Sequence, residues 1–574
     1  MGWIPATTMN APSTDYQQLR FDYVRHADQG SAEPARHPVV VVGAGPVGLA
    51  LAIDLAQQGV PVVLLDNDCT LSTGSRAICF AKRTLEVFDR LGCGERMVAK
   101  GVSWSVGKVF FQGELVYRFD LQAQSGHARP AFINLQQYYV EGYLAERASE
   151  LPLIDIRWQN KVVGIEQHAD HALLTIDTPD GPYALRADHV AACDGSRSTV
   201  RQLIGQETQG RVFRDRFLIA DVKMKLDHPA ERWFWFDPAF HPNQSVLLHK
   251  QPDGVWRIDF QLGWDADPEE EKKPHRIIPR VKALLASSDM RDAEFELEWA
   301  SVYTFACLRM PRFRVGRVLF AGDAAHGVSP FGARGANSGV QDAENLAWKL
   351  AHVVHGSAPD ALLDTYADER EFAADENIRH SSRATDFITP KSEISLLFRN
   401  AVLSLARHHP FARMLVNSGR LSVPAVLHAS ALNTPDADGF TGCVPLGSAA
   451  PDAPVQHPDG SSDWLLHHLG GGFTALVYGD ATGRLETMVR KAAAGTEAIN
   501  IVSVAPAGTA CSHAQLLDLE GVVVKRYGVQ PGSVVLMRPD QHVCARWHAP
   551  TPAAVRAALR RALALPPATT PELA

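Results

Sequence analysis

The chain has 574 residues, of which 46% are hydrophobic and 21% charged, and its formal net charge at pH 7 is −8. These values are typical of a globular protein with two or three domains, and the net charge argues against a broad nucleic-acid or anionic-membrane surface. The eight cysteines include no CxxC pair, which argues against a cysteine zinc site or redox dithiol and fits a cytoplasmic location. We find no signal peptide, myristoylation motif or membrane span, and we expect no metal site.

Residues 1–36 are polar with little periodicity and are expected to form an extension. Residues 39–66 then follow the order strand, glycine turn, helix, strand, acid: VVVVGAGPVGLALAIDLAQQGVPVVLLD. Gly43, Gly45 and Gly48 would let the backbone turn tightly and approach a pyrophosphate, while Asp66 would accept hydrogen bonds from a ribose. A glycine-rich turn in a buried βαβ unit would not explain three glycines with a strand-end acid, so the stretch predicts a dinucleotide site.

Two more acids, Asp194 and Asp323, end strand-like runs beside a turn glycine. The carboxyl ends of parallel strands gather at one edge of a sheet, so both acids are expected to reach the same long ligand. The alternative for each is an acid that caps a helix. Arg76 and Arg83 would stand near phosphates if their segment folds back beside the first strand, and the alternative is two surface arginines.

Residues 217–262 are rich in β-branched and aromatic residues and predict an antiparallel sheet. In the run 255–262, Arg257, Asp259 and Gln261 share one face, which is either solvated or lines a polar cavity. The other face is core: Trp256, Ile258, Phe260 and Leu262. A short helix is expected at 279–286, with Pro279 in its first turn.

A boundary is expected near 432–460, where Pro, Gly and Asp are frequent. Beyond it the sequence predicts a small α/β unit. Its expected strands are 473–478, 499–504, 522–527, 534–537 and 543–547, followed by a helix at 552–564.

Three motifs together resemble the fingerprints of single-component FAD-dependent aromatic hydroxylases: GAGPVGL, DGSRSTVR and GDAAHGVSPFGARGANSGVQDAENLAWKL. That family includes p-hydroxybenzoate, phenol and 3-(3-hydroxyphenyl)propionate hydroxylases. The resemblance implies an α/β fold in which a Rossmann-like FAD-binding domain (37–210 and 311–430) is interleaved with an antiparallel-sheet substrate domain (211–310). A linker (431–460) and a thioredoxin-like domain without CxxC (461–574) would follow.

The resemblance also implies roles for individual residues. Gly43, Gly45, Pro46 and Gly48 would hold the FAD pyrophosphate, and Asp66 the adenosine ribose. The remaining FAD contacts would come from three groups: Arg76, Gln137 and Asp194 near the phosphates and ribityl chain; Asp323 at the ribityl hydroxyls; and Pro330, Gly332, Gly335, Ala336 and Asn337 at the flavin ring. Arg334 departs from the Gln or Lys often found there.

The chemistry implied by the family is reduction of FAD by NADH or NADPH, formation of a C4a-hydroperoxyflavin with O2, and attack on an activated phenol ring. A second dinucleotide motif is missing, so the nicotinamide is expected to bind transiently. Candidates for activating the phenol are His249, Asp259 and Tyr303, each with the alternative of a surface or core side chain. Arg257 could bind a substrate carboxylate, or instead pair with Asp259.

The expected function is therefore hydroxylation of a small phenolic compound, with a 3-hydroxyphenyl carboxylic acid favoured by the resemblance. The alternatives are an epoxidase or a polyketide-tailoring hydroxylase on the same fold, and an FAD-binding electron-transfer protein. Residues 233–238 (WFWFDP) only partly match a halogenase signature, because Asp237 breaks it, so the tryptophans are interpreted as core or cavity wall. A homodimer is an expected partner, and a small coupling protein is left open.

Overall fold

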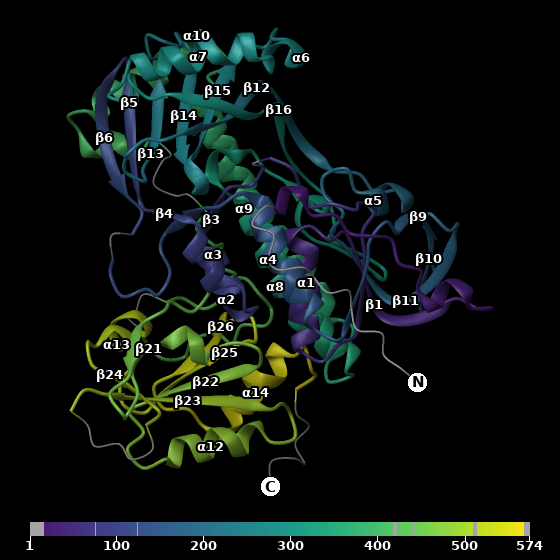
Figure 1. Cartoon of the computed structure of the whole chain (residues 1–574). Coiled ribbons are helices and arrows are strands. Elements are labelled where there is room, and N and C mark those ends of the chain that lie inside the picture. The colour runs from purple at the N-terminus through teal and green to yellow at the C-terminus, as the bar shows by residue number, and fades with distance from the viewer. Residues whose placement is uncertain are drawn as a thin grey trace.

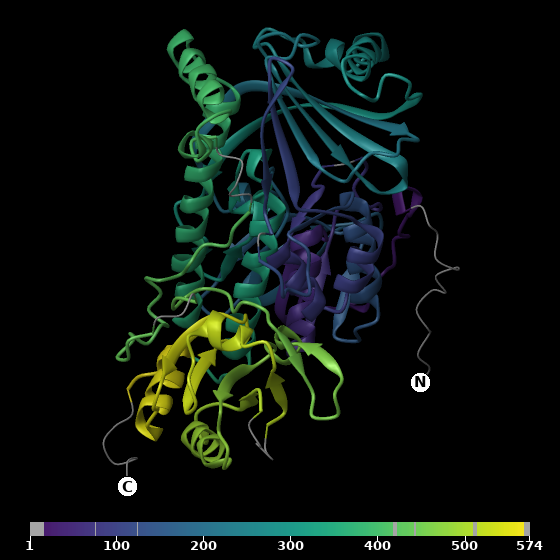
Figure 2. The same ribbon diagram turned by 90° about the vertical axis from the view of Figure 1, so that its left-hand side faces the viewer.

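The computed structural model describes residues 16–567 except 75, 123, 417–421, 441–443 and 509–513. The first fifteen residues of the predicted extension therefore lie outside the described residues. Figure 1 shows three units: an antiparallel sheet at the top, a parallel sheet with long helices in the middle, and a C-terminal unit at the bottom. Figure 2 shows the same layering after a quarter turn. No helix of the described part combines the length and the apolar character that crossing a membrane requires.

The middle unit is built on a sheet whose central strands run parallel in the order β18-β11-β1-β2-β8. Strands β2 and β18 and the C-terminal halves of β1 and β11 are buried, because helices α1, α4 and α8 pack in the same core. This arrangement confirms the predicted Rossmann-like α/β unit. The strand bounds are β1 Ala35–Val42, β2 Val62–Leu65, β8 Ile154–Arg157, β9 Lys161–Gln167, β10 Ala172–Asp177, β11 Tyr183–Ala192, β17 Arg314–Val315 and β18 Val318–Phe320. The main helices are α1 Pro46–Gln57, α2 Lys82–Arg90, α3 Gly94–Lys100, α4 Gln137–Ser149, α5 Thr199–Leu203, α8 Gly335–Val354 and α9 Leu362–Ile388.

The antiparallel sheet has the order β19-β16-β12-β15-β14-β13-β5-β6. Its strands are β5 Val106–Phe111, β6 Glu114–Asp120, β12 Gln209–Met224, β13 Arg232–Phe236, β14 Ser245–Lys250, β15 Val255–Leu262, β16 Phe295–Arg309 and β19 His326–Gly327. Strands β5 and β6 come from within the range expected for the first part of the FAD-binding domain. One face packs on α7 (Pro274–Ala286), and the other packs on α9 and α10 (Glu393–Ala406).

Helix α7 begins earlier than the sequence indicated. Pro274 occupies its first turn, so Pro279 lies inside the helix rather than at its start. The prediction took Pro279 as the start of the helix, whereas the helix begins at Pro274. A short helix, α6 (Pro268–Glu271), precedes it. A three-stranded sheet of β3 (Cys79–Ala81), β7 (Phe132–Asn134) and β4 (Val102–Trp104) lies between the two larger sheets.

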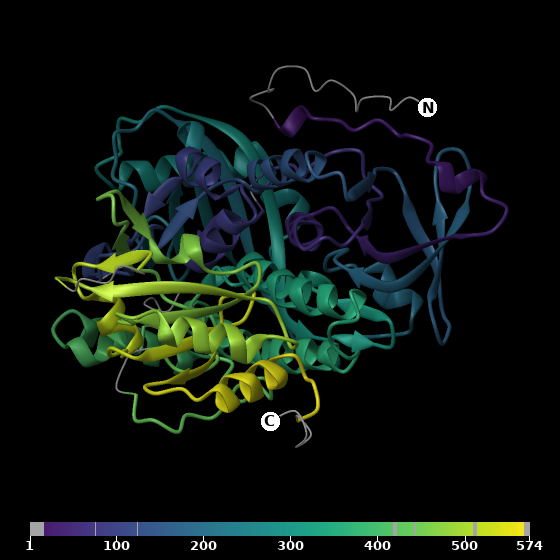
Figure 3. The same cartoon turned by 90° about the horizontal axis from the view of Figure 1, so that it is seen from below.

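The C-terminal unit is a seven-stranded sheet in the order β21-β20-β24-β23-β22-β25-β26. Its elements are β20 Pro454–Gln456, β21 Ser462–Trp464, η6 Leu465–His468, β22 Phe473–Tyr478, α12 Arg484–Ala493, β23 Ile499–Pro506, β24 Leu516–Asp518, α13 Val522–Tyr527, β25 Ser533–Met537, β26 Val543–Trp547 and α14 Pro552–Ala562. Strand β20 lies within the range expected to be a linker. Seen from below in Figure 3, the unit covers one side of the molecule, away from the N-terminal segment.

One predicted strand of this unit is wrong. Residues 522–527 form helix α13, although valine favours strands. The Asp518 carboxylate accepts the N–H groups of Val523 at 3.2 Å and Val524 at 3.1 Å, which satisfies the first turn of a helix. Gly521 and Gly528, both left-handed, bound the segment, so its ends override the strand preference of its middle.

Candidate active site

The ends of four parallel strands open into one cavity of about 720 Å³. Gly43 follows β1, Asp66 follows β2, Asp194 follows β11, and Asp323 follows β18. All four residues line the cavity, which confirms that they meet at a single edge of the sheet. The volume lies within the range of small-molecule binding sites.

The glycine turn is shaped as a phosphate-binding loop requires. Gly43 has a φ of +103°, and a side chain there would come within 2.6 Å of the Cys193 carbonyl oxygen. At Gly48 a Cβ atom would lie 1.9 Å from the Gly43 carbonyl oxygen, so only glycine lets α1 pack this close to the turn. The Asp66 carboxylate accepts the Ala44 N–H at 2.5 Å, which ties the second strand to the loop. Burial raises the pKa of Asp66.

The two carboxylate oxygens of Asp194 have different surroundings. Its Oδ2 accepts the N–H of Val200 in α5 at 3.0 Å, so the helix-capping alternative accounts for one oxygen. Its Oδ1 is buried without a hydrogen-bond partner. A buried polar atom of this kind fits a hydroxyl or N–H of a ligand. Asp323 opens onto the cavity, and desolvation by the surrounding protein raises its pKa.

The α4 helix holds the loop that carries Arg76. The Gln137 side chain accepts the Ala77 N–H at 3.1 Å and donates to Glu141 at 2.7 Å. Arg76 and Gln137 both line the cavity. The functional hypothesis for Arg83 is wrong, because its guanidinium is buried against Glu344 at 2.8 Å, outside the cavity lining. The surface alternative is wrong for the same reason.

Residues 330–337 form the opposite wall of the cavity. The Asn337 side chain accepts the Ala81 N–H at 2.8 Å and donates to the Cys79 carbonyl at 2.9 Å, so it fastens the start of α8 to β3. Arg334 also lines the cavity and donates to Asn377 at 2.7 Å. Of the fourteen predicted cofactor residues, all line the cavity except Gly48 and Gly332, which lie just behind it.

The four candidate catalytic residues lie together at the sheet end of the same cavity: His249, Arg257, Asp259 and Tyr303. Arg257 Nε donates to Asp259 Oδ1 at 2.9 Å, and His249 Nε2 lies 3.3 Å from Asp259 Oδ2. The salt-bridge alternative for Arg257 is therefore realised, and the polar face of β15 lines a cavity instead of facing bulk solvent. The opposite face of β15 packs in the core with Trp233 and Trp235, as predicted.

The cluster has a defined protonation pattern at neutral pH. Burial alone would raise the pKa of Asp259, but the Arg257 guanidinium and the His249 contact lower it to about 2. Burial, helped by the charge of Arg232, lowers the pKa of His249 to about 4. Burial raises the pKa of the Tyr303 phenol above its usual value. Asp259 is thus ionised, His249 is neutral, and Tyr303 keeps its proton.

Sequence reasoning missed Arg232, which lines the same end of the cavity and is only 4% exposed. Its Nε has no hydrogen-bond partner, and no carboxylate of the described residues forms an ion pair with it. Its guanidinium carbon lies 5.0 Å from the ring centroid of Phe234 and 5.8 Å from that of Trp104. The alternation of RWFWF in β13 was the available signal, since it sets Arg232 and Phe234 on the face opposite Trp233 and Trp235.

The fold and the strand-end cavity are those of a protein that binds a dinucleotide, and the polar face of the antiparallel sheet lines the same cavity. A protein-family model described as "FAD binding domain" matches residues 36–381, and the chain belongs to this family. The resemblance to FAD-dependent aromatic hydroxylases is confirmed by its relatives.

Three curated relatives differ in the substrates that their names give and in how much of this chain they match. A probable NADH-specific resorcinol 4-hydroxylase from Rhodococcus jostii is 35% identical over 58% of this chain, and the match spans only 62% of that protein. A 3-(3-hydroxy-phenyl)propionate/3-hydroxycinnamic acid hydroxylase from Mycobacterium sp. (strain JLS) is 30% identical over 77% of this chain and 75% of its own length. A 6-methylpretetramide 4-monooxygenase from Streptomyces rimosus is 31% identical over 93% of this chain and 95% of its own.

A solved structure supports the fold over nearly the whole chain. The flavin-dependent monooxygenase PieE, in complex with FAD and substrate, has a TM-score of 0.79 at 21% identity. The match covers 93% of this chain and 100% of that one.

Proposed function

We propose that this chain is an FAD-dependent monooxygenase that consumes a nicotinamide cofactor and hydroxylates a phenolic ring. The observation that carries the proposal is the shared cavity: the strand-end acids and the polar face of the antiparallel sheet line one continuous space. The glycine turn and the unpartnered Asp194 oxygen fit a bound FAD. When bound, FAD supplies the reduction of O2 and the transfer of one oxygen atom, while the protein binds and orients the ring and excludes water.

Each residue of the cavity wall that we expect to contact FAD is assigned a part of the cofactor. Asp66 would bind the adenosine ribose, Asp194 the phosphate region, and Asp323 the ribityl hydroxyls. Arg76 and Gln137 would lie beside the phosphates, and residues 330–337 against the flavin ring. The fastening of Asn337 to β3 supports a role in shaping that wall, since its amide is already engaged by backbone groups.

His249 is the proposed base for the phenol. It is neutral, its Nε2 is held by Asp259, and its Nδ1 is buried without a partner among the described residues, so Nδ1 can accept a hydrogen bond from a substrate hydroxyl. Because the pKa of His249 is about 4, its role is to orient the hydroxyl and relay the proton, not to keep it. The guanidinium groups of Arg232 and Arg257 would favour the phenolate that results. Asp259 is the weaker base because its pKa is about 2, and Tyr303 is suited to donate a hydrogen bond.

The proposed substrate is a small phenol that carries an acid group, such as a 3-hydroxyphenyl carboxylic acid. A carboxylate would supply the ion pair that buried Arg232 does not form with any of the described residues. Arg257 is less suited to that role, because Asp259 already holds it. NADH is the first reductant to test, since one relative is named as NADH-specific. The second candidate is a polyketide-tailoring hydroxylase, favoured by the near full-length match to the Streptomyces relative.

The C-terminal unit is proposed to be a thioredoxin-like domain with a packing role. Its parallel β22–β23 pair flanked by antiparallel β25 and β26 supports that topology. A buried ionic network joins it to the middle unit: Arg538 bonds Glu369 of α9 at 2.6 Å, and Glu369 also bonds Lys349 of α8 at 2.8 Å. A homodimer and a coupling protein stay predictions.

The deciding experiment uses the purified chain reconstituted with FAD. Oxidation of NADH and of NADPH is followed with a panel of phenols, and the products are analysed for incorporated oxygen. We expect an acid-bearing phenol to stimulate oxidation and to yield a hydroxylated product. Preference for multi-ring phenols would select the polyketide alternative. Oxidation that yields only peroxide with every phenol would refute hydroxylation, and failure to bind FAD would refute the whole proposal.

A further inference from the structure

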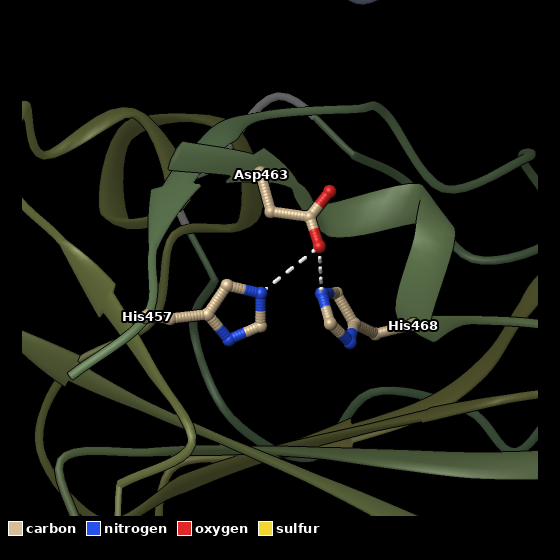
Figure 4. Close-up of side chains that lie close together, drawn as sticks. All are labelled: His457, Asp463 and His468. Atoms are coloured by element: carbon tan, nitrogen blue, oxygen red, sulfur yellow. Dashed lines mark hydrogen bonds and ion pairs between the residues drawn. The ribbon is translucent and has the colours of Figure 1, made fainter. Parts of the chain in front are cut away.

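A cluster of three histidines around one aspartate lies in the C-terminal unit, far along the chain from the flavin site. His457 follows β20, Asp463 lies in β21, and His467 and His468 end η6. Figure 4 shows the rings of His457 and His468 converging on the Asp463 carboxylate. Both Nε2 atoms contact the same oxygen, Oδ2, at 3.1 and 3.0 Å.

We propose that His457, Asp463 and His468 form a binding site for a divalent first-row transition-metal ion, with Zn²⁺ as the ion to test. Two imidazoles and a carboxylate are ligands that Zn²⁺ accepts in proteins. The site is independent of the proposed hydroxylase function.

The spacing of the ligand atoms suits such an ion. Bonds of 2.0–2.1 Å in a tetrahedral arrangement set neighbouring ligand atoms about 3.3 Å apart. The two contacts to Asp463 are within a few tenths of an ångström of that spacing, and the three ligand atoms all lie within 4.8 Å of one another. The ion could therefore bind with small rotations of the side chains and without movement of the backbone.

The backbone that carries the ligands is held in place by other contacts. Leu465 N donates to the Ala453 carbonyl at 2.9 Å, and Leu466 N donates to Asp452 at 3.1 Å, which joins η6 to the start of β20. Val455 and Leu465 are buried in the core of the unit on either side of the cluster. Because the ligands stand on a fixed scaffold, less conformational entropy is lost on binding.

The surroundings of Asp463 also favour a cation. Its contacts among the described residues include no Lys or Arg, only imidazoles and the Trp464 N–H. His467 Nδ1 lies 2.7 Å from the other oxygen, Oδ1, and so orients the carboxylate from outside the proposed ligand set. His457, Asp463 and His468 are 35%, 23% and 25% exposed, which leaves a solvent side where water can complete the coordination.

This cluster was not predicted from the sequence, because the expectation that no metal binds rested on cysteine spacing alone. Ligands at 457, 463 and 468 follow no common zinc signature. Only the turn between β20 and β21 and the direct entry into η6 bring them together.

The test is Zn²⁺ titration by calorimetry of the full-length, FAD-loaded chain after chelator treatment. We expect one Zn²⁺ per chain and a rise in Tm. His457→Ala and His468→Ala should each weaken binding by more than about 100-fold, and His467→Ala by only about 10- to 100-fold, as for a residue that orients a ligand. The matched control is His275→Ala, since His275 makes a single exposed contact with Glu270 at 2.9 Å and should not affect binding.

A second probe checks the coordination directly. Co²⁺ in place of Zn²⁺ should give the visible absorption of a low-coordinate site in the unaltered chain, and His468→Ala should abolish it. Unchanged flavin absorbance and far-UV circular dichroism confirm that a variant is folded, and the near-isosteric Asp463→Asn replaces any variant that is not. Lack of saturable uptake by the unaltered chain would overturn the proposal and leave a hydrogen-bonded cluster only. Uptake by His457→Ala and His468→Ala equal to that of the unaltered chain would overturn it as well.

Discussion

Arg232→Met separates the stabilising role of a buried arginine from a substrate-binding role. The change keeps an unbranched side chain and removes a buried charge that forms no ion pair with a carboxylate of the described residues. Two ring contacts, to Phe234 and Trp104, are lost at about 2 kcal/mol each, the value for desolvated pairs. Relief of the desolvation penalty, several kcal/mol for a buried ion, offsets or exceeds that loss. The free energy of unfolding of the ligand-free protein should therefore stay the same or rise by up to about 2 kcal/mol.

The same change should weaken binding of an acidic substrate. Truncating one partner of a buried, hydrogen-bonded charge pair costs 2–5 kcal/mol, and about 3 kcal/mol corresponds to a factor of about 100. We expect KM for an acid-bearing phenol to rise about 100-fold, while KM for the same phenol without the acid group changes little. The assays are urea unfolding and steady-state oxidation of the reduced nicotinamide.

Arg257→Met is the matched control in the same cavity. Its loss would leave Asp259 buried without its cationic partner, so the protein should be destabilised by about 3–5 kcal/mol. The two variants should thus move stability in opposite directions. Equal destabilisation by both variants, or an unchanged ratio of KM between the acidic and acid-free phenols in Arg232→Met, would refute the reasoning. An unchanged KM for the acid in Arg257→Ala would remove Arg257 from substrate binding.

Three further predictions concern other parts of the molecule. The folded-state pKa of His249 is about 4, below its unfolded value of about 6.5, so the unfolded chain takes up a proton before the folded protein does. The stability that neutral His249 allows is therefore present above about pH 6.5, and about 3 kcal/mol is lost as pH falls to about 4. Urea unfolding should show a smaller change in unfolding free energy between pH 7 and pH 5 for His249→Gln than for the unaltered protein. Gly48→Ala places a Cβ atom 1.9 Å from the Gly43 oxygen, so the purified protein should lose bound FAD and about 1–3 kcal/mol, measured by flavin absorbance and Tm; retained flavin would contradict this. Glu369→Gln leaves buried Lys349 without its carboxylate and removes one of the two carboxylates that Arg538 contacts, so it should cost about 3–5 kcal/mol. Exposed Asp368→Asn should cost less than about 1 kcal/mol, and similar Tm values for the two variants would count against the network.

The sequence predicted well which strand ends lie together at the cavity, because the signals for these strand ends are local. The glycine or acid that follows each strand marks where the strand ends. Because parallel strands end at the same edge of the sheet, Asp66, Asp194 and Asp323 are then expected to lie together, as they do. The alternation of β15 likewise set Arg257 and Asp259 on one face. The choice between a solvated face and a cavity wall could not be made, because it depends on where the two sheets meet.

The features that could not be predicted from the sequence depend on contacts between residues distant along the chain. Arg83 looked like a phosphate ligand, but it is engaged by Glu344 and by the Gln541 side chain at 2.7 Å, 458 residues away. Arg232 is notable because it is buried and forms no ion pair with a carboxylate of the described residues, and a missing ion pair leaves no pattern in a sequence. Residues 522–527 were predicted as a strand because of their valines, but the Asp518 cap and the two flanking glycines make the segment helical.

The buried network around Glu369 has a consequence for how this architecture can be recombined. Arg538 of the C-terminal unit pairs with Glu369 of α9 across the interface, and each of the two also has a partner within its own unit, Asp540 for Arg538 and Lys349 for Glu369. Exchanging the C-terminal unit for one without an arginine at this place would remove the pair that crosses the interface, unless α8 and α9 were exchanged with it. Because α8 begins at the cavity wall, a graft that keeps this pair also brings a new wall to the cavity. The C-terminal unit therefore cannot be exchanged with its buried ion pairs intact unless part of the cavity is exchanged too.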